Sequence, residues 1–162
     1  MDDSSLNRIL DDFERESFLS PTFIASGHST VADVIAGMPE IKALLEQRNA
    51  SAPLMVARYR ERDSTMSDHE RLAYFVVFGL MSRREMTHDI AAYLRRCGRT
   101  PHSTLAWPWH PYFYGVRALE SFTGGEVQAP AGKVSAKDVG RFIAAVEKWE
   151  QTHVQQDVGK HE

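Results

Sequence analysis

The sequence has a single cysteine, no signal-peptide pattern and no long apolar run, and each absence narrows the class of protein. Cys97 has no second cysteine within the 162 residues with which to form an internal disulfide. The first five residues, Met-Asp-Asp-Ser-Ser, lack the basic start and apolar stretch of a signal peptide. The longest apolar run, residues 72–81, is about half the ~20 residues that a membrane span needs. We therefore expect a cytoplasmic protein without a membrane partner.

Strand patterns are also missing from the sequence. No stretch alternates apolar and polar residues for more than a few positions, and no Asn-Gly or Asp-Gly lies between β-branched runs. The length suits one domain with a real core. We predict an all-α fold of about six or seven helices, with residues 1–155 as a single domain and 156–162 as a flexible tail.

Signatures of catalysis are absent as well. The chain contains no Gly-x-Ser-x-Gly, His-Glu-x-x-His or Gly-x-x-x-x-Gly-Lys. Cys97 falls on the apolar face of a predicted helix, which is typical of a buried and unreactive thiol. The sequence therefore predicts a protein that is not an enzyme and that uses no cofactor.

The most informative stretch, residues 67–98, is predicted to form a helical hairpin. Ser67 and Glu70 have the spacing of a capping box, which predicts a helix from Asp68 to about Met81. Residues 72–81 are apolar except for Gly79, and a helix with one wet face could not carry such a run. We expect this first arm to be the most buried helix of the fold.

The second arm of the hairpin is predicted to be amphipathic. Ser82 and Glu85 repeat the capping-box spacing directly after the first arm. Apolar residues then recur at helical spacing up to Cys97, and Gly98 is placed to end the helix as a left-handed C-cap.

Apolar residues recur at helical spacing in the rest of the chain too. They predict an amphipathic helix with an acidic outer face at residues 4–19, a helix at 34–48 interrupted or restarted by Pro39, and a helix that Pro53 begins after a break at 49–53. They also predict a helix from Pro111 to the glycines at 124–125, and a last helix that begins after Ser135 and frays beyond His153.

The predicted hairpin resembles a HEAT-type α-helical repeat. The resemblance is carried by residues 53–62 and 68–96, above all by RLAYFVVFG at 71–79 and DIAAYL at 89–94. It covers residues 53–97 only. It implies a short, irregular stack of antiparallel helical hairpins, an architecture that usually presents a surface to another macromolecule.

Charge is distributed unevenly along the chain. Residues 1–50 carry nine acidic and four basic residues, a net charge of −5, whereas residues 51–101 carry six and nine, a net of +3. All nine bases of this middle third are arginines, which leaves a nucleic-acid binder as an alternative function. Acidic residues are interleaved with these arginines, however, so we favour a solvated or salt-bridged face.

Two Glu-x-x-His motifs, at residues 85–88 and 150–153, raise the alternative of a helical bundle that binds a metal or small ligand. With twelve Glu and seven His in 162 residues, chance alone predicts about 0.5 Glu-x-x-His motifs, so two motifs are a weak signal. Glu85 is already assigned to a cap, and no Glu lies on a predicted apolar stripe. We therefore assign no metal site.

The strongest candidates for a binding site are aromatic. Residues 99–110 are predicted to be a long loop, and Trp and Tyr are frequent at binding hot spots. Carboxylates on the outer face of the first helix would attract a basic partner. The predicted partner-binding residues are Trp107, Trp109, His110, Tyr112, Asp12 and Glu16. The favoured function is a small bacterial-type immunity or inhibitor protein that binds a toxin. For the aromatic loop itself, the alternative to a binding site is that it folds back over the core.

Overall fold

The computed structural model describes residues 3–16, 37–97, 111–131 and 135–159. Over these ranges the chain forms seven α-helices, one short 3-10 helix and no β-strand, so the all-α prediction is confirmed. The elements are α1 (Asp3–Glu16), α4 (Pro39–Glu46), α5 (Arg48–Arg62), α6 (Asp68–Met81), the 3-10 helix η1 (Arg84–Met86), α7 (Thr87–Arg96), α8 (Pro111–Phe122) and α9 (Ala136–Gly159).

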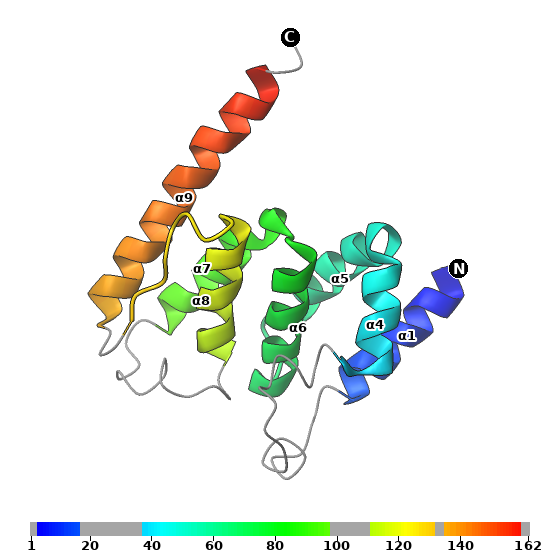
Figure 1. Ribbon diagram of the computed structural model, residues 1–162. Coiled ribbons are helices and arrows are strands. Elements are labelled where there is room, and N and C mark those ends of the chain that lie inside the picture. Colours follow the sequence, from blue (N-terminus) through cyan, green and yellow to red (C-terminus); the bar gives the residue numbers. More distant parts are fainter. Residues whose placement is uncertain (1–2, 17–36, 98–110, 132–134, 160–162) are drawn as a thin grey trace.

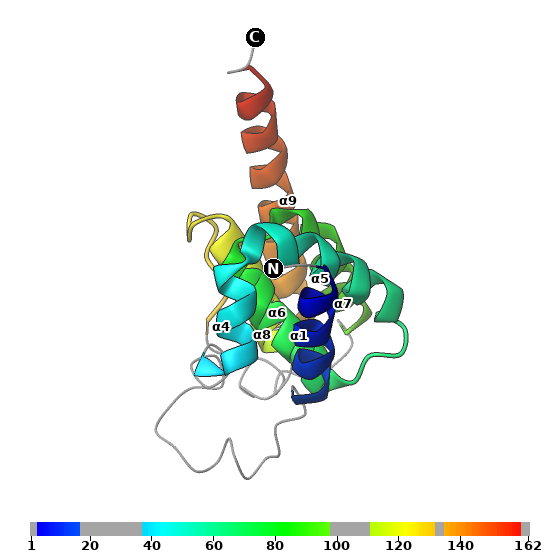
Figure 2. The ribbon, with the colours of Figure 1, turned by 90° about the vertical axis from the view of Figure 1, so that its right-hand side faces the viewer.

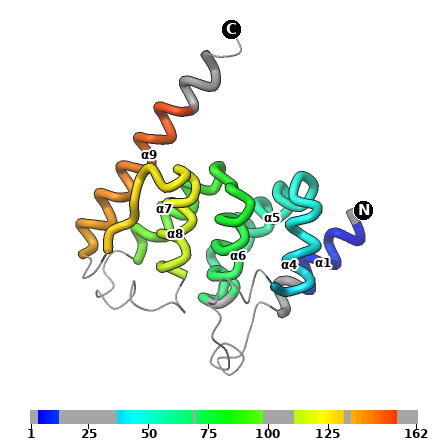
Figure 3. Tube along the Cα trace, viewed as in Figure 1, coloured from blue at the N-terminus to red at the C-terminus, as the bar shows by residue number. Residues whose placement is uncertain are grey.

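The helices follow one another in a row, from α1 at one end of the molecule to α9 at the other (Figure 1). Seen from the α1 end, α4, α6 and α8 lie on one side, and α5 and α7 lie on the other (Figure 2). Helices α6 and α8 run side by side in the same direction (Figure 3), and α7 packs against α8. One hydrophobic core extends through the row, from Leu6 in α1 to Val146 in α9.

Helix α6 is the centre of this row, and its predicted start is confirmed. The Ser67 hydroxyl accepts a hydrogen bond from the Glu70 N–H at 3.3 Å, and the helix begins at Asp68. Every residue from 72 to 78 is at most 6% exposed. The nearly continuous apolar sequence is therefore explained by burial on both sides of the helix.

The second predicted capping box, at Ser82, is wrong. Ser82 adopts the left-handed conformation, with φ 52° and ψ 48°, and its N–H donates to Gly79 O at 3.2 Å. Ser82 therefore ends α6 and does not begin the next helix. Glu85 forms an ion pair with Arg83, and α7 begins only at Thr87, after η1.

The break predicted just before Pro53 is also wrong. Helix α5 begins at Arg48, and Pro53 lies inside it. The chain turns at Gln47 instead, where α4 has just ended. The reason is a tertiary contact: Ser51 is fully buried, and its hydroxyl donates to Leu44 O at 2.8 Å. This bond satisfies a carbonyl at the end of α4 and holds the start of α5 against it.

The predicted limits of α8 and the predicted start of α9 fit the structure. Gly124 and Gly125 follow α8 with φ values of 62° and 81°, which only glycine adopts without strain. Ser135 and Asp138 cap α9 reciprocally: the Ser135 N–H donates to the Asp138 carboxylate at 2.9 Å, and the Asp138 N–H donates to the Ser135 hydroxyl at 3.2 Å. Helix α9 continues to Gly159, past the point where we expected fraying.

Candidate binding groove between α6 and α8

An open apolar groove of about 360 Å³ lies along α6 and α8. Its α6 side is formed by Phe75, Val76, Gly79 and Leu80, and its α8 side by Phe113, Tyr114, Arg117, Ala118 and Ser121. Arg117 is the only charged residue among these. We call this site the α6–α8 groove.

Small residues explain why the groove exists. A Cβ atom placed on Gly79 would lie 3.6 Å from the Ala118 Cα, so the two helices approach closely at this point. On the inner side of α8, a Cβ on Gly115 would lie 3.1 Å from the Leu94 side chain and 3.2 Å from Phe75. Gly115 therefore lets α8 sit deep against the core, while Gly79 and Ala118 leave the outer side shallowly hollowed.

Leu80 borders the groove and is 46% exposed. In the part of the chain that the structure describes, it is the only large hydrophobic side chain in the exposed class. The sequence predicted that Leu80 is buried with the rest of its helix, and this prediction is wrong. Helix α6 is buried as far as Phe78, but the Leu80 side chain in its last turn is exposed to solvent. An exposed leucine beside an apolar hollow marks a place where a further apolar surface can bind.

Arg117 is held at the edge of the groove by two neighbours. Its guanidinium lies over the Phe113 ring, 5.2 Å from the centroid, and its Nη1 donates to Glu120 Oε1 at 3.3 Å. Glu120 is itself held, because its other oxygen accepts the Ala129 N–H at 2.5 Å. The Arg117 side chain is nevertheless 55% exposed. The groove thus combines an apolar floor with one positioned positive charge.

A buried arginine ties α6 to α5 and α7 on the other side of the core. Arg71 is 5% exposed and donates to the Tyr59 hydroxyl at 2.7 Å, to Asp63 O at 2.6 Å and to the Asp63 carboxylate. Its guanidinium lies 4.6 Å from the centroid of the Tyr93 ring. Arg96 also donates to the Asp63 carboxylate, at 3.1 Å. No local sequence pattern distinguishes Arg71 from the surface arginines.

This arrangement shifts the pKa values of its members. Partial burial would raise the pKa of Asp63, but hydrogen bonds from Arg71 and Arg96 outweigh it and hold that pKa below its usual value. Burial raises the pKa of Tyr59, so its hydroxyl stays protonated and can accept from Arg71. The cluster is a satisfied ion pair within the core, and we assign it a structural role.

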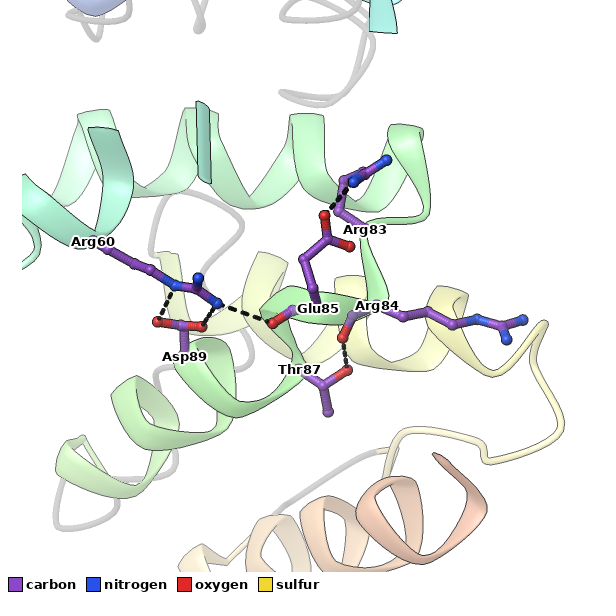
Figure 4. A network of polar contacts seen from close by, with 6 residues as sticks. All are labelled: Arg60, Arg83, Arg84, Glu85, Thr87 and Asp89. Atoms are coloured by element: carbon purple, nitrogen blue, oxygen red, sulfur yellow. Dashed lines mark hydrogen bonds and ion pairs between the residues drawn. The ribbon is translucent and has the colours of Figure 1, made fainter. Parts of the chain in front are cut away.

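The arginines of the middle third are mostly paired with acids, as the interleaved charges suggested. Figure 4 shows the turn between α6 and α7, where Arg60 binds both oxygens of Asp89, at 3.3 and 3.0 Å, and Arg83 meets Glu85. Arg84 points away from this network and lies 4.9 Å from the Trp149 ring centroid. Four further ion pairs join arginines of this third to acids: Arg58–Asp11, Arg62–Glu70, Arg95–Glu147 and Arg96–Asp63.

Of the six predicted partner-binding residues, the structure describes the side chains of two, Asp12 and Tyr112. Trp107, Trp109 and His110 lie outside the described residues, as does the side chain of Glu16. Asp12 lies in α1, half-buried. Tyr112 is only 5% exposed in α8, where burial raises its pKa to about 12, so its ring belongs to the core and not to an exposed rim.

The two Glu-x-x-His motifs differ in their surroundings. Glu85 pairs with Arg83, whereas His153 stacks on Trp149 with 3.8 Å between ring centroids. One expectation is corrected here: Glu70 is a buried glutamate, 2% exposed, and it pairs with Arg62. Over the described ranges, no three His, Cys, Asp or Glu side chains gather closely enough to hold a metal ion.

No family model, curated protein or solved structure matches this chain. None of the helices in the described ranges is both long and apolar enough to cross a membrane. Sequence reasoning missed the α6–α8 groove. The signals available to it were Leu80 beside Gly79, and an arginine four residues after Phe113 on a helix otherwise rich in apolar residues.

Proposed function

We propose that this protein is a non-enzymatic interaction protein that binds a segment of another protein in the α6–α8 groove. The observation that carries the proposal is the open apolar groove with Leu80, 46% exposed, at its edge. Covering an exposed leucine with a partner removes apolar surface from water, at roughly 25 cal/mol per Å². The groove would supply the desolvated centre of an interface, and the charged residues around it would supply the rim.

The fold supports the same proposal. The α6 side of the groove belongs to the most buried helix, and the α8 side is packed on Leu94 and Phe75 through Gly115. Side chains held in this way lose little conformational freedom when a partner binds, so less of the contact energy is lost to ordering.

A small inhibitor of a basic toxin is the more specific form of the proposal. Its support is the acidic first third of the chain, with a net charge of −5 over residues 1–50. On this hypothesis, charge reversal at Asp12 slows association at low salt, since a carboxylate that is partly accessible to solvent mainly steers the encounter.

The groove is tested by peptides selected from a phage-displayed random library on the wild-type protein. Ser121 is exposed and lines the groove, so Ser121→Trp places an indole over it. We expect this variant to weaken peptide binding by more than about thirtyfold, which corresponds to ~2 kcal/mol at a hot spot. Leu80→Ala should weaken it by about fivefold, since close to half of the side chain remains to be buried.

The matched control is Ala145→Trp, which adds the same indole at an exposed position of α9. It should leave peptide affinity unchanged. Mass spectrometry should recover the bound peptide chemically unaltered. Peptides that bind Ser121→Trp as tightly as the wild type would place the interface elsewhere, and a cleaved or modified peptide would refute the non-enzymatic part of the proposal.

A further inference from the structure

The chemistry of the groove also indicates what kind of segment it accepts; this step rests on the proposed function. We propose that the occupant is a short amphipathic helix of a partner protein, which places apolar side chains in the groove and a carboxylate against Arg117. Three features of the groove lead to this proposal: its lack of backbone-pairing groups, its length, and its single charge.

The first feature is the polar chemistry of the lining. Two neutral polar side chains line the groove, those of Ser121 and Tyr114, and the Ser121 hydroxyl already donates to Ala118 O at 2.8 Å. The walls are helices, whose backbone groups bond within the helix. The N–H and C=O groups of an extended peptide that face this apolar floor would be left unsatisfied, at a cost of about 1–3 kcal/mol for each. A helical peptide satisfies them internally, so the groove favours a helix.

The second feature is length. On α8 the lining residues run from Phe113 to Ser121, eight steps along the helix, or about 12 Å at 1.5 Å per residue. The apolar stripe of a helical peptide with anchors at i, i+4 and i+7 is about 10 Å long. Two turns of helix therefore match the groove.

The third feature is charge. Arg117 is the only charged residue that lines the described groove, and its side chain is 55% exposed. The Phe113 ring beneath the guanidinium and Glu120 beside it hold that side chain at the edge of the groove. A guanidinium has five N–H donors, and a planar carboxylate matches two of them at once. A partner helix with Asp or Glu beside its apolar stripe would therefore complement the groove, whereas Lys or Arg there would be repelled.

The experiment uses the peptides selected above, with each acidic residue changed to its amide. We expect the selected peptides to become helical on binding and to share an Asp or Glu next to apolar residues spaced i, i+4. Replacing that acid by its amide should weaken binding to the wild-type protein about fivefold, and should change binding to Arg117→Gln by less than twofold. Arg141→Gln is the matched control, because Arg141 is also exposed and also has an acidic partner three residues away on its own helix, Asp138 on α9.

The outcomes separate this inference from the proposed function. If Ser121→Trp abolishes binding but the acid-to-amide change has the same effect on the wild type and on Arg117→Gln, the groove is the site and the carboxylate proposal is refuted. If the peptides bind Ser121→Trp normally, or if the selection yields no binder, both proposals fail. If a second copy of this chain occupies the groove, the wild type will dimerise and Ser121→Trp will not, which refutes the partner-helix proposal.

Discussion

Replacing Arg71 is the perturbation with the most definite expected result. The guanidinium, 5% exposed, is the shared partner of the Tyr59 hydroxyl and the Asp63 carboxylate. Arg71→Met keeps most of the side-chain volume but leaves the Tyr59 hydroxyl buried without its donor, at about 1–3 kcal/mol. Removing one member of a buried ion pair usually costs about 3–5 kcal/mol. Asp63 is 32% exposed and still has its ion pair with Arg96 in this variant. We therefore expect a loss of stability at the lower end of this range, about 3 kcal/mol.

The assay is urea unfolding followed by circular dichroism. With an m-value of about 2 kcal/mol per molar urea, Arg71→Met should lower the midpoint by about 1.5 M. Asp63→Asn should cost a similar amount, because it leaves a buried guanidinium without its counter-ion. The double variant should cost about 2 kcal/mol less than the two single changes together, which is the coupling between the side chains. Arg96→Met is the control: its side chain is 53% exposed, so its ion pair with Asp63 contributes only about 0.5 kcal/mol.

The same pair predicts an acid-dependent stability. The pKa of Asp63 is lower in the folded protein than its ordinary value of about 3.9, so its stabilising contribution is complete above that pH and is lost as the pH falls through the folded-state pKa. Between pH 5 and the folded-state pKa, Asp63→Asn should therefore lose less stability than the wild type. Additive effects of Arg71→Met and Asp63→Asn, or an Arg71→Met variant as stable as the wild type, would refute the assignment of this ion pair as a stabilising link.

Two further predictions concern the backbone of the central helices, and urea unfolding measures both. Gly79→Ala should raise the free energy of unfolding by up to about 1 kcal/mol, because alanine favours the helix and its Cβ meets neighbours at 3.6 Å or more. Gly115→Ala should lower the free energy of unfolding by about 1–2 kcal/mol, because its Cβ would lie 3.1–3.3 Å from three core side chains. Equal effects would contradict the packing described at these two positions. Ser82→Gly should raise the free energy of unfolding by about 1 kcal/mol, because φ at Ser82 is 52° and glycine adopts a positive φ with less strain than serine. Ser82→Ala should give no gain. A gain from alanine would show that the backbone conformation at residue 82 does not cause the stabilisation.

The sequence predicts the helices well where several local signals agree. The capping box at Ser67 and the apolar run after it place both ends of α6 correctly. The same is true of α8, which begins at Pro111 and ends before two glycines. At Pro53 the local signal is misleading, because the buried hydroxyl of Ser51 binds the end of α4 and moves the turn. That contact depends on tertiary packing, which a local pattern does not contain.

The α6–α8 groove is harder to predict because it depends on two segments far apart in the sequence. Residues 75–80 and 113–121 meet only in the folded chain, where α6 and α8 pack directly against each other. Periodicity can identify the apolar stripe of each helix, but not which apolar residues remain uncovered after the helices pack. Leu80 therefore resembles its buried neighbours in sequence, although it is 46% exposed. The aromatic residues that composition highlighted include Tyr112, which is used in the core.

The buried ion pair and the groove are connected through α6, and this connection explains why the groove can be preformed. Arg71 fixes the first turns of α6 to α5 and α7, and the left-handed Ser82 ends the helix. Between these two points lie the α6 residues that face α8, and a Cβ on Gly79 would be in van der Waals contact with Ala118, at 3.6 Å from its Cα. Because the groove lies between a helix that Arg71 ties to its neighbours and one packed on the core, a partner can bind without ordering either wall. The binding free energy then depends mainly on the apolar surface that the partner covers and on its contact with Arg117.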